Sequence, residues 1–75
     1  MNEERRKQLR IWSKKQRGLK DELESILWDE QNSYDNIPEN LQNSQRAEDS
    51  EEAISQIEEA VENIEEAINL VDEIV

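Results

Sequence analysis

Apolar residues in the C-terminal part of the chain recur in steps of three and four. The segment reads EEAISQI, EEAVENI and EEAINLV over residues 51–71, followed by DEIV. A seven-residue repeat of this kind places one apolar seam along one side of an α-helix. The seam residues predicted here are Ile54, Ile57, Val61, Ile64, Ile68 and Val71. We therefore predict a helix over about residues 45–75.

A second row of small or apolar residues lies beside this seam. It consists of Ala53, Ala60, Ala67 and Ile74. The apolar stripe is therefore wider than a two-stranded coiled coil requires, and it favours a helix that contacts two neighbours. Asp49 and Glu52 have the spacing of a capping box, which predicts a cap at the start of the repeat.

The N-terminal half has a weaker version of the same pattern. Its predicted seam, in steps of three and four, is Leu9, Trp12, Gln16, Leu19, Leu23 and Ile26. Gln16 is the one polar residue of this seam, a feature that can fix register at some cost in stability. We predict a helix over about residues 3–33.

The stretch between the two helices, residues 34–44, is rich in Asn and contains the only proline, Pro38. A proline favours the first position of a short helical turn, because its missing amide proton is not needed there. Two helices of similar length joined by a short corner form an antiparallel hairpin. The predicted fold is therefore all-α, with residues 1–75 as one helical-hairpin domain.

The heptads predict a register as well as a fold. Placing Leu9 opposite Val71 and Trp12 opposite Ile68 pairs the seams along their whole length. The flanking charges then pair Arg6 with Asp72, and Lys20 with Glu58. A single hairpin leaves one side of its apolar stripe in water, so we expect a homodimer that closes into a four-helix bundle.

Charge is divided unevenly along the chain, whose formal net charge is −11. Residues 1–20 contain eight Lys/Arg against two Glu, a net +6, and residues 21–75 contain one Arg against eighteen Asp/Glu, a net −17. Phosphate repels such an acidic surface, which argues against direct binding to nucleic acid or to an anionic membrane. The expected partner is a protein with a basic surface.

The acidic residues of the repeat form the candidate partner-binding face. They are Glu51, Glu52, Glu58, Glu59, Glu62, Glu65, Glu66, Asp72 and Glu73. A rigid double row of carboxylates can occupy a groove built for phosphates, and the near absence of Lys/Arg on this helix favours that interpretation. The alternative is a solvated helix face that only keeps a small bundle soluble.

Two aromatic residues lie near the corner and off the seam. Trp28 either packs at the corner under Tyr34, Ile37 and Leu41, or forms with Tyr34 an exposed anchor for a partner, since aromatic residues dominate interface hot spots.

The composition provides little for catalysis. The chain has no histidine and no cysteine, which removes the commonest general base and the commonest zinc ligands. We predict no catalytic residue, no cofactor, no metal site and no enzyme activity. The charged first twenty residues do not have the pattern of a signal peptide or membrane span, so the expected location is the cytoplasm.

One part of the sequence resembles a known group of proteins. The corner YDNIPENLQ at residues 34–42, the SQR that follows at 44–46, and the EEAI heptads resemble small, acidic, uncharacterised helical proteins of Gram-positive bacteria and their phages. The resemblance covers residues 19–75 and implies a phage or prophage origin. On that basis we expect a phage-encoded stoichiometric inhibitor of a host defence or nucleic-acid-handling protein. The alternative is a structural or adaptor coiled-coil module.

Overall fold

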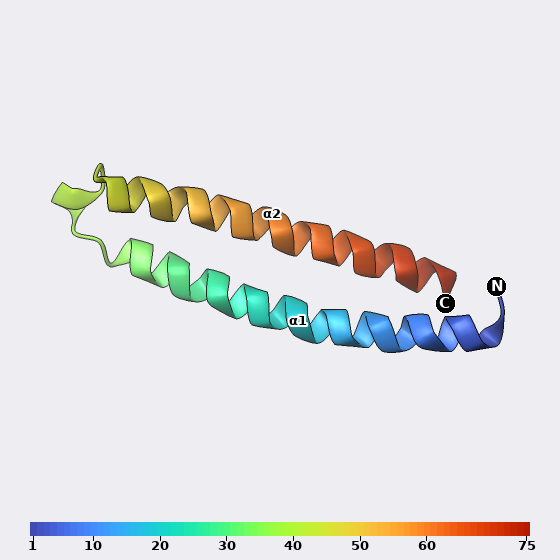
Figure 1. Cartoon of the computed structure of the whole chain (residues 1–75). Coiled ribbons are helices and arrows are strands. Elements are labelled where there is room, and N and C mark those ends of the chain that lie inside the picture. The colour runs from blue at the N-terminus through green and yellow to red at the C-terminus, as the bar shows by residue number, and fades with distance from the viewer.

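A computed structural model describes the whole chain, residues 1–75. Helix α1 spans Glu3–Asp35, a short 3-10 helix η1 spans Glu39–Leu41, and helix α2 spans Gln45–Ile74. The two long helices run antiparallel with both termini at one end (Figure 1), and the hairpin measures 59 × 14 × 13 Å. The prediction of an all-α antiparallel hairpin is confirmed.

Each long helix begins at a side-chain cap. Asn2 Oδ1 accepts the Arg5 amide N–H at 2.9 Å, and Ser44 Oγ accepts the Ala47 amide N–H at 3.3 Å. These bonds satisfy amides that have no partner within the helix. The cap predicted at Asp49 is wrong, because Ser44 starts the helix earlier; Asp49 instead accepts a hydrogen bond from the Gln45 side chain at 2.7 Å.

The corner is ordered by one buried apolar residue. Ile37 is buried, and its carbonyl oxygen accepts a hydrogen bond from the Gln42 side chain at 3.3 Å. Pro38 precedes η1, as its fixed φ favours. Leu41 stays half exposed, so Ile37 is the apolar side chain of the corner that is most fully buried.

The core of a single hairpin is thin. Only three apolar side chains, those of Ile37, Ala47 and Ile68, are buried. Two more buried positions carry serine, Ser13 and Ser50. The seam residues of α2 other than Ile68 remain partly exposed. A chain of this length generally needs a further source of stability.

Helix α1 is rotated from its predicted orientation. The side chains of α1 that are buried or partly buried are Arg6, Leu9, Ser13, Gln16, Lys20, Leu23, Leu27, Glu30, Gln31 and Tyr34. Leu9, Gln16 and Leu23 therefore lie against α2 as predicted. Leu19 and Ile26 do not, since they are 51% and 56% exposed, and Trp12 is covered only in part, with 37% exposed. The row containing Ser13 and Lys20 replaces them in the seam.

The register also differs from the prediction. Asp72 contacts Ser13 and Arg17 instead of Arg6, and Lys20 lies near Glu65 instead of Glu58. Both charged pairs are therefore displaced by one heptad, from residue 6 to 13 and from residue 58 to 65. This shift by one heptad also separates Trp12 from Ile68, which were predicted to pair. The apolar seams alone do not decide between neighbouring registers.

Candidate functional site

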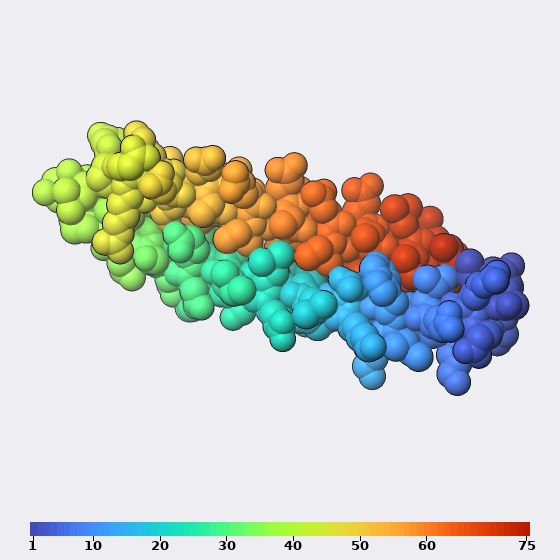
Figure 2. All heavy atoms as spheres, viewed as in Figure 1, coloured from blue at the N-terminus to red at the C-terminus, as the bar shows by residue number.

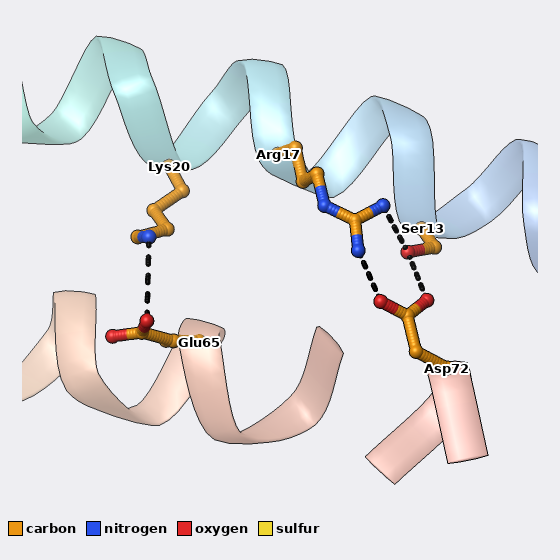
Figure 3. Close-up of polar contacts among 5 residues, drawn as sticks. All are labelled: Ser13, Arg17, Lys20, Glu65 and Asp72. Carbon is orange, nitrogen blue, oxygen red and sulfur yellow. Dashed lines mark hydrogen bonds and ion pairs between the residues drawn. The ribbon is translucent and has the colours of Figure 1, made fainter. Parts of the chain in front are cut away.

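One long side of the hairpin is held together by polar contacts, and we call it the polar side. Four acidic residues of α2, spaced by seven, each contact a side chain of α1 there; they are Glu51, Glu58, Glu65 and Asp72. Figure 3 shows the part nearest the open end, where Asp72 meets Ser13 and Arg17, and Lys20 points at Glu65.

Ser13 is the centre of the tightest of these contacts. Its side chain is 1% exposed, its hydroxyl donates to Asp72 at 2.7 Å, and it accepts from Arg17 Nη1 at 3.0 Å. Arg17 Nη2 pairs with the other Asp72 oxygen. A small serine lets the two helices approach here, while the charge-assisted bonds occupy its polar atoms. Farther along the seam, Ser50 donates to Glu30 at 2.7 Å in the same manner.

The polar side continues to the corner with uncharged donors. Gln31 Nε2 donates to Glu58 at 3.3 Å, and the Tyr34 hydroxyl donates to Glu51. The hydrogen bond to Glu51, with the nearby carboxylates, raises the pKa of the Tyr34 phenol above its usual value. Sequence reasoning missed Ser13, Arg17 and Gln31, although a three-four spacing runs from Arg6 to Tyr34 through Ser13 and Lys20.

The structure thus divides the predicted acidic face into two rows with different surroundings. Glu51, Glu58, Glu65 and Asp72 contact α1 and contribute to the fold. The other predicted residues point away from α1, are exposed and take part in no ion pair or side-chain hydrogen bond; they are Glu52, Glu59, Glu62, Glu66 and Glu73. We call these five residues the outer acidic face.

The outer acidic face is regular because α2 is regular. Glu52, Glu59, Glu66 and Glu73 repeat every seven residues, so neighbouring carboxylates lie about 10 Å apart along the helix. No lysine or arginine follows Arg46 in the chain. This face therefore presents an uncompensated negative charge to whatever approaches it.

Near the corner, Trp28 and Tyr34 line an open cleft of about 430 Å³ with Asp35, Glu51 and Ile54. The sequence left open whether Trp28 is packed at the corner or exposed. In the structure its side chain is 63% exposed. Because its neighbours include carboxylates, this aromatic ring is placed for contact with a cationic side chain.

The opposite long side of the hairpin is apolar, and we call it the apolar side. Residues that are seven apart lie on the same face of these helices. The alanine row of α2 therefore flanks the apolar seam on one side, and the row of Glu58 and Glu65 flanks it on the other. The apolar side consists of Trp12, Leu19 and Ile26 of α1 and of Ala53, Ala60, Ala67 and Ile74 of α2. At its open end, Trp12 lines a groove of about 450 Å³ with Met1, Leu9 and Val71. Figure 2 shows how slender the single hairpin is along its whole length.

The arrangement of charged groups does not resemble a metal centre. No three Asp or Glu residues come together in a way that would hold an ion. Neither α1 nor α2 contains an uncharged apolar stretch long enough to span a lipid bilayer. What the surface offers is two extended faces for contact, one acidic and one apolar.

No protein-family model, curated protein or solved structure matches this chain. The resemblance at the corner and the heptads therefore remains an interpretation of the sequence.

Proposed function

We propose that this chain is a non-catalytic protein-binding module whose outer acidic face binds a basic surface of another protein. The observation that carries the proposal is the separation of the acidic residues of α2 into two rows. The inner row contacts side chains of α1, whereas the outer acidic face is exposed and has no cation beside it. A carboxylate row that only stabilised the fold would lie on the polar side. The outer row has no such structural role.

A protein that binds nucleic acid is the kind of partner that fits this face. Such proteins have basic grooves shaped for a regular series of phosphates. Four carboxylates at a fixed spacing on a rigid helix offer a comparable series of negative charges. With the phage origin that the corner resemblance implies, the function we propose is stoichiometric inhibition of a host defence or nucleic-acid-handling protein, in the host cytoplasm.

The apolar side supports a second part of the proposal, that two hairpins associate into a four-helix bundle. Leu19 and Ile26 are more than half exposed, and burial of such residues stabilises a complex by about 25 cal/mol per Å² of apolar area. The outer acidic face points away from α1, and we expect it to stay accessible after association. Light scattering is expected to give twice the mass of one 8.9 kDa chain; a single-chain mass at high micromolar concentration would refute the dimer.

Binding of a host protein to the outer acidic face is tested by affinity capture from a Gram-positive host lysate at low and high salt. The variant Glu59→Gln, Glu66→Gln, Glu73→Gln removes three charges from the outer acidic face. The matched control, Glu4→Gln, Asp21→Asn, Glu39→Gln, changes the net charge by the same three units at exposed positions elsewhere. We expect a captured protein that is released by salt, lost with the first variant and retained with the control.

The captured protein is then purified, and its activity is titrated with the chain. Inhibition that is complete at a fixed molar ratio supports the inhibitor function. Equal capture by both variants, or recovery of the chain alone, would overturn it and favour a structural or adaptor module that acts through the apolar side.

A further inference from the structure

We propose that a second copy of this chain covers the apolar side about a two-fold axis that passes beside Leu19. In this arrangement α1 packs antiparallel on the partner's α1, with the two corners at opposite ends of the bundle. The inference rests on the proposed self-association and adds its register and symmetry. The large apolar residues of α1 and the charges beside them are both spaced to match a second copy.

The large residues of the apolar side are symmetric about Leu19. Trp12 precedes Leu19 by seven residues, and Ile26 follows it by seven. A two-fold axis at Leu19 therefore places Leu19 against the partner's Leu19, and Trp12 against the partner's Ile26. Each exposed apolar side chain of this row then meets an apolar side chain, as a self-complementary interface requires.

The row beside these residues has charges that match under the same symmetry. It reads Gln8, Lys15, Glu22 and Asp29, again in steps of seven. All four side chains are exposed, and none makes an ion pair or a side-chain hydrogen bond within the hairpin. The two-fold axis brings Lys15 opposite the partner's Glu22, and it does so twice. It brings Asp29 opposite the partner's Gln8, so no like charges face each other.

Helix α2 is uncharged along the stripe that would meet the partner. The stripe contains residues 53, 56, 60, 63, 67, 70 and 74, which are Ala, Gln, Ala, Asn, Ala, Leu and Ile. The rest of the exposed surface of α2 is densely acidic, so this stripe is the exposed direction in which two such helices bring the fewest carboxylates together. Its alanines also permit a close approach of the two backbones.

A different two-fold arrangement would place both corners at the same end and pack α1 on the partner's α2. Leu19 would then lie against the alanine stripe, far from its own copy, and Lys15 would face no carboxylate of that stripe. The two arrangements therefore differ in whether Leu19 meets Leu19.

Because the chain has no cysteine, a single substitution tests the axis. A disulfide requires Cα atoms within about 7 Å of each other. We expect Leu19→Cys to form a covalent dimer under mild oxidation at micromolar concentration. Ser25→Cys, on the exposed outer surface of α1, is the control and should stay monomeric on a denaturing gel. A Leu19→Cys chain that remains a dimer by light scattering without cross-linking would overturn the proposed axis but not self-association.

Charge reversal at Glu22 gives a second, independent test. Glu22→Lys lowers the net negative charge from −11 to −9, which by long-range repulsion alone would tighten a dimer. The proposed contact predicts the opposite, a dissociation constant about tenfold higher, because the two Lys15 side chains would each face a lysine. Adding Lys15→Glu should restore the original value to within about threefold. Tighter association of Glu22→Lys, or no rescue by the double variant, would overturn the proposal.

Discussion

The two long sides of the hairpin contain similar numbers of heptad positions but hold different interactions. On the polar side, Asp72 and Glu65 of α2 reach Arg17 and Lys20 of α1, and the contacts are made within one chain. On the apolar side, Leu19 and Ile26 remain more than half exposed. The difference teaches that polar contacts take part in orienting α1: Ser13 and Lys20 lie in the seam against α2, and the row containing Leu19 is turned toward solvent.

This orientation has an energetic reason. An apolar side chain gains similarly from burial against any apolar surface, because the hydrophobic effect is non-directional. A carboxylate such as Asp72 gains only where a donor lies at hydrogen-bond distance. When an adjacent chain can cover the apolar residues, the rotation that satisfies the polar ones costs little. The polar side therefore decides the rotation of α1, and the apolar side is left exposed.

The largest effect is expected in the narrow core between the two sides. Ile68 is 4% exposed, and truncation of a buried isoleucine to alanine costs about 2–4 kcal/mol through lost burial and the cavity left behind. Ile68→Ala should lower the free energy of unfolding by that amount in denaturant titrations followed by circular dichroism. A loss below about 1 kcal/mol would mean that the seam is not formed as described.

A smaller effect, dependent on protein concentration, is expected on the apolar side. Leu19→Ala should destabilise the protein by about 2 kcal/mol per chain where the dimer forms, and by less than about 1 kcal/mol at high dilution. Thermal melts over a hundredfold range of concentration measure the difference. If the cost is the same at every concentration, association does not involve Leu19.

On the polar side the effect should be about 1 kcal/mol and independent of concentration. Asp72→Ala removes the acceptor of both Ser13 and Arg17, and it leaves the buried Ser13 hydroxyl without its acceptor. The neighbouring exposed Glu73→Ala is the control, with an expected change within about 0.5 kcal/mol. Equal effects of the two variants would remove the distinction between the inner and outer acidic rows.

A gain of stability is expected on the outer surface of α1, away from both sides. Nothing lies within 4 Å of a Cβ added at Gly18, and α1 is helical there. Gly18→Ala should therefore stabilise the hairpin by up to about 1 kcal/mol through helix propensity. The denaturation midpoint should rise without a change in the mass measured by light scattering. A loss of stability would show that this surface is occupied in the assembled protein.

The smallest effect concerns pH at the corner end of the polar side. The hydrogen bond to Glu51 raises the pKa of Tyr34, so the folded state holds the phenol proton more tightly than the unfolded state does. Its contribution should be constant below the unfolded pKa of about 10 and disappear as pH rises through the raised pKa of the folded state. Tyr34 is the only tyrosine, so its phenolate absorbance reports the titration directly. A Tyr34→Phe variant equally stable at neutral pH would show that the bond contributes nothing.

The sequence by itself determined the two helices, the corner and the antiparallel hairpin. The unbroken EEAI heptads define α2, and a corner of about ten residues leaves no other way for two such helices to pack. The predicted seam of α2 and half of that of α1 follow from the same periodicity. The sequence also located the acidic residues, because a seven-residue repeat places them on one helix at fixed directions.

Only the tertiary structure decided the rotation of α1, the register and the division of the acidic residues into two rows. Heptads placed on Leu9, Trp12 and Gln16 or on Leu9, Ser13 and Gln16 differ by a small rotation of α1, and apolar counting favours the first. The structure has the second, because Ser13, Arg17 and Asp72 form bonds that need exact distances between residues far apart in the chain. Periodicity describes directions around one helix, whereas hydrogen bonds between two helices depend on how both are turned and shifted together.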